Sequence, residues 1–328
     1  MSKLKLRHHA ALGGGFALSA FFLWLAMRQV EGQSLRDAFA TIKYFPVMLC
    51  ASALYLGIIL RAVRWRVVAG FPATQQHNFS RATNLGVLTN LILPGRAGEF
   101  VRVLTLAKLS KSSLPGPLAS ALIDRLLDIF VLLVSASVLY WLFPIGALLG
   151  KWLTVFLTMG CVITLFVVLY ARSSGFGEAW IEKLAERWLQ RWPLQPKAFL
   201  AEIRAEFRRI LGGWLSIEVL ALAALILFVD YGAVALLLKA FSLSLPLEAP
   251  LLLWVFLAAG SALPSAPGYV GVYQVAAVWA LSFFSVAAPT SVAVATVLQV
   301  IALAVALIMA GPGTWGIIRR TLFVKTLA

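Results

Sequence analysis

Long apolar stretches separated by short basic ones make up most of this chain. Six of them approach the roughly 20 residues that an α-helix needs to cross a bilayer. These stretches are 10–28, 44–62, 117–143, 152–171, 213–238 and 289–311. The pattern predicts an all-α, polytopic integral membrane protein with about six full transmembrane helices.

Two further apolar segments, 83–110 and 250–285, are each interrupted by a five-residue break. The breaks are Pro94-Gly95-Arg96-Ala97-Gly98 and Pro267-Gly268-Tyr269-Val270-Gly271. The arms beside them, each about half a membrane long, are Leu85–Leu93, Phe100–Leu109, Leu251–Leu263 and Val272–Phe284. Unwound backbone at membrane depth is tolerated only where protein or a watery cavity surrounds it. We therefore predict two re-entrant hairpins, with eight complete spans as the alternative. A third match, Pro312 to Gly316, ends the last apolar stretch.

The order of these segments predicts an inverted repeat. Span 44–62, the first hairpin and span 117–143 are repeated, in opposite orientation, as span 213–238, the second hairpin and span 289–311. The predicted domain organisation is a single transmembrane domain, 1–328, with a first half 1–171, a connector 172–212 and a second half 213–328. In transporters of this type, paired broken segments mark the substrate site.

The connector is polar and amphipathic. Its apolar side chains fall at helical spacing in two groups, Trp180, Ile181, Leu184 and Trp188, then Phe199, Ile203, Phe207 and Ile210. Basic amphipathic helices lie in the membrane interface. We predict a cytoplasmic connector at the inner leaflet, with docking of a membrane-protein partner or lipid sensing as the alternative.

Composition supports the membrane prediction. Of 328 residues, 61% are hydrophobic and 12% charged, whereas soluble proteins have about 45–50% and about 25%. A net charge of +15 would suggest nucleic acid in a soluble protein. Here the basic residues gather between spans and predict cytoplasmic N- and C-termini, so no nucleic-acid partner is expected. The basic residues predicted outside are Arg28, Arg36, Lys43, Lys151 and Lys239.

Charged side chains inside membrane segments are candidate functional residues, because each costs about 2.5–3.5 kcal/mol to insert. They are Arg96, Glu99, Arg102, Asp124, Arg125 and Asp128. We interpret them as an internally paired network, and direct contact with a lipid head group is the alternative. An acid/base couple or a proton relay is not favoured, because the neighbouring arginines would keep the carboxylates ionised.

Other polar residues allow two interpretations each. Three arginines lie around Trp65 at the end of a span: Arg61, Arg64 and Arg66. They are either ordinary basic anchors at the membrane surface or a clamp that binds a phosphate group. Polar side chains of the second hairpin either satisfy freed backbone groups or bind a head group. They are Ser261, Ser265, Tyr269, Tyr273 and Gln274. Glu218 and Asp230 are acids without an obvious partner.

Cysteine and histidine give no sign of a metal site. Cys50 and Cys161 lie singly in apolar stretches, and the histidines are His8, His9 and His77. The sequence has no Cys-x-x-Cys or His-x-x-x-His pair and no nucleophile elbow. No metal or other cofactor is expected.

The first break carries a specific motif. Asn90, Pro94, Arg96, Gly98, Glu99 and Arg102 are spaced as in the transmembrane region of lysylphosphatidylglycerol synthases, which the chain resembles over nearly its whole length. This flippase-like group also has stand-alone members. Asp124-Arg125-Leu-Leu-Asp128 is similar to a family stretch that usually begins with Glu, and Arg61 to Arg66 resembles its Arg-Trp-Arg stretch.

The second break also resembles a family stretch, from Pro264 to Gln274, although many members have Glu at the position of Gln274. The motifs together give the candidate substrate-binding residues. They are Arg61, Arg64, Asn90, Pro94, Gly95, Arg96, Gly98, Glu99, Arg102, Asp124, Arg125, Asp128, Pro264, Pro267, Gly268, Gly271, Tyr273 and Gln274.

The resemblance implies the lipid-handling part of such a protein without a soluble synthase domain. We expect a lipid or glycolipid translocator of the bacterial inner membrane that holds an anionic or lipid-linked head group near the midplane. It would not be an enzyme, and membrane lipids would be its partners. One alternative is a membrane-embedded lipid-modifying transferase with Asp124 or Glu99 as base. Another is an accessory subunit of an envelope-lipid pathway acting through 172–212.

Overall fold

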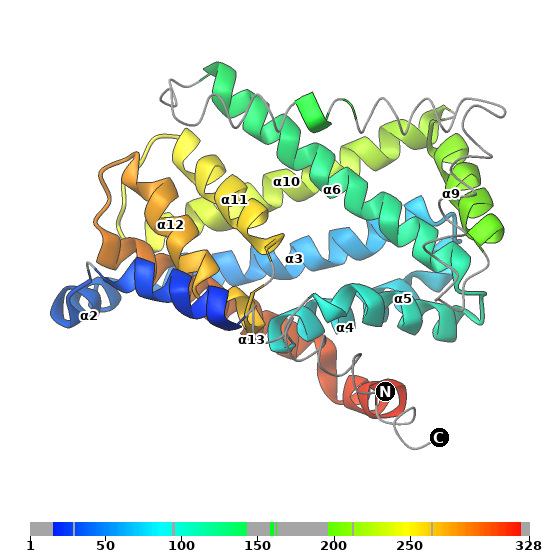
Figure 1. The fold of residues 1–328 in the computed structure, drawn as a ribbon, viewed down its shortest axis with the longest axis horizontal. Helices are drawn as coiled ribbons and strands as arrows, with labels where there is room; N and C mark the ends of the chain where they lie inside the picture. The colour runs from blue at the N-terminus through cyan, green and yellow to red at the C-terminus, as the bar shows by residue number, and fades with distance from the viewer. Residues whose placement is uncertain are drawn as a thin grey trace. The chain divides into compact units, whose positions relative to one another are not determined.

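The computed structural model describes residues 16–28, 30–93, 96–142, 158–160, 162, 196–211, 213–263 and 265–322. The regular structure in these ranges is helical and includes no strand (Figure 1). The all-α prediction is confirmed for the described ranges. Most of the predicted span 152–171, and the amphipathic stretch from Trp180 to Trp188, lie outside them.

Three helices of the described ranges are long and apolar enough to cross a membrane. They are α3 (Tyr44–Val68), α10 (Trp214–Ala240) and the Ala288–Gly311 part of α13. All three expose large apolar side chains, as surfaces facing acyl chains would. Examples are Phe45, Phe228 and Ile308. These features confirm a membrane protein, and the number of crossings stays a prediction.

α6 (Pro115–Leu142) has 28 residues, which at about 1.5 Å per residue exceeds the thickness of a hydrocarbon core. Its first half carries Asp124, Arg125 and Asp128. α6 is therefore a long helix with a charged first half, and the predicted membrane crossing over 117–143 stays a prediction.

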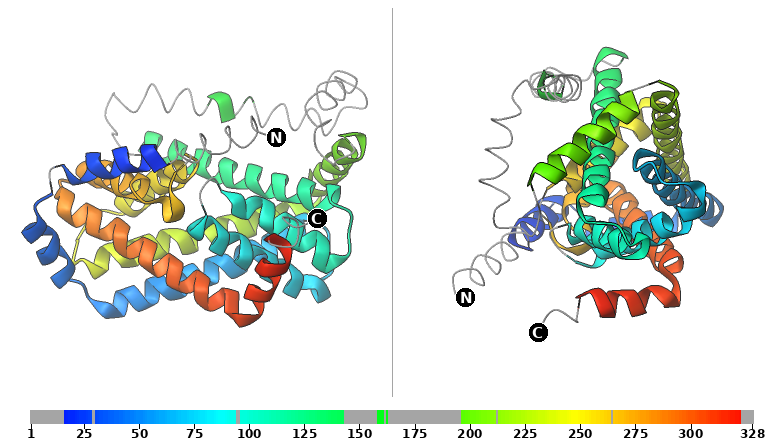
Figure 2. Two further views of the ribbon diagram at one scale, coloured as in Figure 1. Left: turned by 60° about the horizontal axis from the view of Figure 1, so that its bottom comes forward. Right: turned by 90° about the vertical axis from the view of Figure 1, so that its right-hand side faces the viewer.

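α13 (Ala288–Leu322) changes direction at Gly311, where φ is 59° and ψ is 171° (Figure 2). Pro312 follows and has no N–H group to continue the helical ladder. Asn84 donates from Nδ2 to the carbonyl oxygen of Met309 at 3.1 Å, so one acceptor near the bend is satisfied from another helix. The apolar stretch ends at this bend, as predicted for the third Pro-Gly match.

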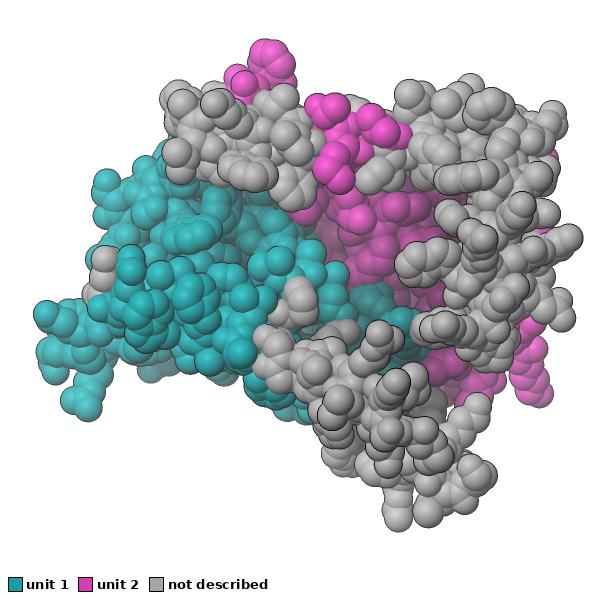
Figure 3. Space-filling view, viewed as in Figure 1, with its two compact units in different colours: residues 1–58, 84–101, 228–328 teal, residues 59–83, 102–227 magenta. Residues whose placement is uncertain are grey.

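The chain forms two compact units, each assembled from separate stretches of sequence (Figure 3). Unit 1 contains Met1–Ile58, Asn84–Val101 and Phe228–Ala328, and unit 2 contains Ile59–Thr83 and Arg102–Leu227. Each unit thus draws on both predicted halves of the sequence. The inverted repeat concerns sequence order and stays a prediction.

In unit 1 the second broken segment forms two short helices that pack against each other, α11 (Glu248–Ser261) and α12 (Val272–Ser282). The 3-10 turn η2 (Pro267–Tyr269) lies between them. α12 packs on α13, which also packs on α2 (Gly32–Ala40). The predicted arms of this segment are confirmed as helices. Their entry into the membrane from one side stays a prediction.

The first broken segment also forms two helices, α4 (Gln76–Ile92) and α5 (Ala97–Ser110). The predicted first arm, Leu85–Leu93, is too short, because α4 begins at Gln76. Hydropathy missed the first turns of α4, which are polar. Gln76 donates to Ser80 Oγ at 3.3 Å one turn further on, and Asn78 is buried.

In unit 2, α9 (Pro196–Leu211) packs against α6. Ile210 of α9 joins Val68 of α3 and Ile123 of α6 in one core cluster. Arg209 donates hydrogen bonds to the carbonyl oxygens of Val67 and Val68 at the end of α3. The amphipathic helix predicted from Phe199 to Ile210 is confirmed, and its apolar face packs within its own unit.

The carboxyl of Glu206 on α9 gives unit 2 a pH dependence. Burial raises the pKa of Glu206 above its ordinary 4.5, against the lowering effect of Arg209, whose guanidinium lies 2.7 Å away. A group with a raised pKa in the folded state binds protons better when folded, so its contribution to stability is lost as the pH rises. We expect Glu206→Gln to gain stability relative to wild type as the pH rises above 4.5, the ordinary pKa of glutamate.

The measurement is the unfolding midpoint of the detergent-solubilised chain across this pH range, with Glu31→Gln, an exposed site beside α2, as the matched control. Parallel pH curves for wild type and Glu206→Gln would contradict the prediction.

Candidate functional site

The side chain of Asn90 closes the turn between α4 and α5 in unit 1. Its Oδ1 accepts a hydrogen bond from the backbone N–H of Gly98 at 2.8 Å, and its Nδ2 donates to Glu99 Oε1 at 3.4 Å. Both partners lie in the first turn of α5, where backbone N–H groups lack partners within the helix. A Cβ added at Gly98 would overlap the carbonyl oxygen of Gly86. The two helices therefore meet at a contact that requires glycine.

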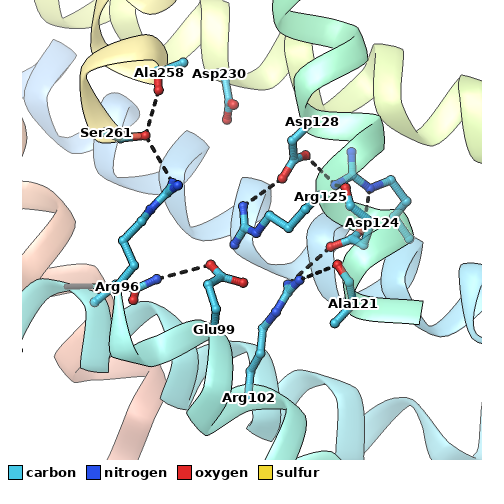
Figure 4. Close-up of polar contacts among 12 residues, drawn as sticks. Arg96, Glu99, Arg102, Ala121, Asp124, Arg125, Asp128, Asp230, Ala258 and Ser261 are labelled. Carbon is cyan, nitrogen blue, oxygen red and sulfur yellow. Dashed lines mark hydrogen bonds and ion pairs between the residues drawn. The ribbon is translucent and has the colours of Figure 1, made fainter. Parts of the chain in front are cut away.

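Arg96 lies in this turn with a left-handed backbone, at a φ of 55°. Its Nη2 is 3.5 Å from Ser261 Oγ, at the end of α11 (Figure 4). That separation is at the outer limit of a hydrogen bond. Nε of Arg96 is buried and has no hydrogen-bond partner in the part of the chain that the structure describes. Because a guanidinium has five N–H donors, Arg96 has donors left for a further acceptor.

Side-chain amides satisfy the unwound backbone of the second break. Gln274 Oε1 accepts from the N–H of Gly271 at 2.7 Å, and Gln299 Nε2 donates to the carbonyl oxygen of Gly268 at 2.7 Å. The two amides are joined at 2.6 Å, from Gln274 Nε2 to Gln299 Oε1. Ser19 Oγ accepts from the N–H of Ala266 at 2.6 Å. Gln274 thus satisfies freed backbone groups, one of its two predicted roles. Gln299 and Ser19 were not predicted.

The two breaks lie together in unit 1. A Cβ added at Gly268 would be 3.5 Å from the carbonyl oxygen of Leu91 at the end of α4. Arg96, in the first break, also contacts Ser261 at the end of α11, the helix that precedes the second break. Pro94, Gly95 and Pro264 fall outside the described residues, while Pro267 begins η2. Segments that are 165 residues apart at the Arg96–Ser261 contact therefore meet in unit 1.

In unit 2, buried charges form an ion-pair cluster around Asp124. Arg64 Nε lies 2.9 Å from Asp124 Oδ1, and Arg102 Nη1 lies 3.2 Å from Asp124 Oδ2 (Figure 4). The side chains of Arg64, Asp124 and Arg102 are 1%, 2% and 6% exposed. Each Asp124 oxygen therefore faces one guanidinium in a site closed to solvent.

The cluster becomes more open at Asp128. Arg64 Nη2 lies 2.5 Å from Asp128 Oδ1, and Arg125 Nη1 lies 2.8 Å from Asp128 Oδ2. Asp128 and Arg125 are 30% and 37% exposed. Arg61 is close enough to act electrostatically on Asp128. The Asp128 end of the cluster is therefore its more exposed end.

Trp65 packs the other end of the cluster. The guanidinium carbon of Arg102 lies 4.7 Å from the centre of the Trp65 ring, which is a cation–π contact. The indole N–H donates to Ser120 Oγ at 3.1 Å. Trp65 is fully buried, so it is a core residue of unit 2.

The predicted ion pairs of Arg102, Asp124, Arg125 and Asp128 are thus present, and one residue joins them that we had not placed there. That residue is Arg64, which we had interpreted as an anchor or a phosphate clamp. Arg96 and Glu99 contact Ser261 and Asn90 in unit 1. Among the described residues, no group of His, Cys, Asp and Glu is placed to hold a metal ion.

Asp230 on α10 has a partner, contrary to our expectation of an isolated acid. Its Oδ2 accepts a hydrogen bond from the indole N–H of Trp254 on α11 at 3.2 Å, and the residue is 7% exposed. The sequence offered no signal for this pair, since tryptophans are frequent in the chain. Glu218, by contrast, is exposed on α10.

Comparison with known proteins identifies a family for nearly the whole chain. A family model described as the lysylphosphatidylglycerol synthase TM region matches residues 14–310 of 328. The matched range includes both breaks and the ion-pair cluster. The comparisons with curated proteins and with solved structures give no match.

Proposed function

Because this chain belongs to the lysylphosphatidylglycerol synthase transmembrane-region family, a membrane family of lipid-related function, we propose that it is a lipid translocator. It would carry a lipid with an anionic or lipid-linked head group between leaflets, as a flippase or scramblase. The observation that carries this proposal is Arg96, whose Nε has no hydrogen-bond partner among the described residues and whose Nη2 reaches Ser261, at the end of the helix before the second break. Broken helices of this kind form substrate sites in transporters.

Arg96 is the residue best suited to the head group. Arginine binds phosphate oxygens through a planar, two-pronged set of donors. Arg64 and Arg102 are directed to Asp124 and are nearly closed to solvent, so we assign them to stabilising unit 2. The acyl chains would stay in lipid while the head group passes the unwound segments.

The proposal includes a location. A bacterial inner membrane with both chain ends in the cytoplasm fits the excess of basic residues in the predicted cytoplasmic segments. The driving force would be a gradient or consumption of the lipid after transfer, since the sequence contains no nucleotide-binding motif.

Reconstitution tests the proposal. In vesicles that contain a fluorescent anionic phospholipid, the wild-type protein should accelerate exchange of this lipid between leaflets. Arg96→Ala should reduce that acceleration about tenfold or more, because a hydrogen bond to a charged group contributes about 1.5–3 kcal/mol. Arg36→Ala on α2 removes an exposed arginine of the same unit and serves as the matched control. Equal exchange in wild type, both variants and empty vesicles would reject the proposal.

The two alternatives gain no specific support. In a lipid-modifying transferase with Asp124 as base, the reacting group of the lipid would have to reach a carboxylate that is 2% exposed and already bonded to two arginines. Lipid profiling of a deletion strain distinguishes the two functions, since an enzyme changes lipid chemistry and a translocator only leaflet distribution. An accessory subunit would need a free docking face on 172–212, and the apolar face of α9 packs within unit 2.

A further inference from the structure

The two breaks share a backbone feature at matched positions. The third residue of each, Arg96 and Tyr269, is left-handed, with φ of 55° and 59°. The other described non-glycine residues with positive φ, Lys111, Ser242 and Ser285, closely follow the ends of helices, where this conformation is common. Within the breaks it strains a large side chain, and such strain persists where a functional arrangement requires it.

Tyr269 stacks on Tyr273, with ring centres 5.0 Å apart and planes at 10°. Three backbone groups of the second break, Gly271 N–H, Gly268 C=O and Ala266 N–H, are bonded by Gln274, Gln299 and Ser19. Both rings are half-buried. One part of each ring is therefore supported by packing, and another part is accessible to a ligand. A parallel pair offers a flat aromatic surface with a hydroxyl group at its edge.

Two contacts connect the turn that carries Tyr269 with the turn that carries Arg96. Gly268, directly before Tyr269, packs on the carbonyl oxygen of Leu91, and Arg96 reaches Ser261 on the helix that leads into η2. One turn therefore supplies a guanidinium and the other an aromatic platform. The combination fits a head group that has both an anionic oxygen cluster and a flat apolar face.

We propose that Tyr269, backed by Tyr273, is the second part of the head-group site, and that the head group is a glycosyl phosphate on a lipid. The phosphate binds Arg96 through paired N–H donors. The sugar ring lays its C–H face on the Tyr269 ring and its hydroxyl groups against polar neighbours such as Ser261. This inference rests on the proposed function and names the substrate class of that site.

A cationic amine is the other ligand that an aromatic face attracts. Ammonium groups are typically enclosed by several rings at angles to one another, whereas Tyr269 and Tyr273 are nearly parallel. Arg96 would also repel an amine placed beside it. The geometry therefore favours the sugar.

Competition in the vesicle assay tests the inference. Unlabelled dodecyl phosphoglucose, dodecyl phosphate and dodecyl phosphoethanolamine are compared as inhibitors of exchange of a fluorescent anionic phospholipid. In wild type the glucosyl compound should inhibit about tenfold more strongly than dodecyl phosphate. This preference should disappear in Tyr269→Ala and Tyr269→Gly and persist in Trp279→Ala, which removes an exposed aromatic residue of α12.

Tyr269→Gly separates binding from folding. Glycine adopts a φ of 59° without strain, so this variant should melt at or above the wild-type temperature and still lose the preference. Equal inhibition by the glucosyl compound and dodecyl phosphate in wild type would overturn the inference, as would a preference for the ethanolamine compound that Tyr269→Ala removes.

The shift in melting temperature of the purified full chain, in a detergent without a sugar group, measures ligand binding independently of transport. If wild type gives no exchange, the proposed function fails, but a larger shift with dodecyl phosphoglucose than with dodecyl phosphate, lost in Tyr269→Gly, still supports the site. Equal shifts with both compounds overturn it.

Discussion

Asp124→Ala should lower the free energy of unfolding by about 3–5 kcal/mol, the expected loss when one partner of a buried ion pair is removed. Asp124 pairs with Arg102 and, together with Asp128, with Arg64. Removing it leaves two guanidinium groups, 1% and 6% exposed, with less compensating charge. The unfolding midpoint of the solubilised protein in an SDS titration measures the loss.

Asp128→Ala provides a graded comparison within the same cluster. Asp128 pairs with Arg64 and Arg125, but it is 30% exposed, so solvent can replace part of its interaction. We expect a smaller loss than for Asp124→Ala, and no measurable loss for Asp37→Ala, an exposed carboxylate on α2. Equal losses at Asp124 and Asp128 would show that burial does not control the energetics of this cluster.

Sequence reasoning succeeded where a local residue dictates the backbone. Proline and glycine indicate the position of a break to within a few residues. The second break coincides with η2, which lies between α11 and α12. The charges of α6 were also recognised as paired, because an isolated charge in an apolar segment is too costly. Local chemistry thus predicted the elements and the kind of contact.

The partners within those contacts could not be predicted, because they come from distant parts of the chain. Arg64 is 60 residues from Asp124, and in sequence it resembled any basic residue at a span end. Gln299 was one polar residue within an apolar stretch, and its bond to Gly268 exists only after α13 packs beside η2. The polar first turns of α4 were not predicted for a related reason. A hydropathy pattern does not indicate a helix whose polar side chains form hydrogen bonds inside the fold.

The second large effect is expected at Gly98, where α4 and α5 meet. Gly98→Ala places a methyl group against the backbone carbonyl oxygen of Gly86 and 2.6 Å from Asn90 Oδ1. A backbone atom cannot rotate away as a side chain can, so the helices must separate, and the Asn90 hydrogen bond to the Gly98 N–H must lengthen. We expect a loss of about 3 kcal/mol, the upper part of the range for overpacking, with reduced lipid exchange.

Gly116→Ala is the matched control, because an added Cβ at this position in the first turn of α6 has no atom within 4 Å. It should be neutral or slightly stabilising, since alanine favours a helix more than glycine does. Asn90→Ala separates the two consequences of Gly98→Ala, since it removes the hydrogen bond without the overlap and should cost about 1 kcal/mol. If Gly98→Ala lost no more stability than Asn90→Ala, the close approach of α4 and α5 would not hold the first break. Arg96 would then owe its position to Ser261 and its own strained backbone alone.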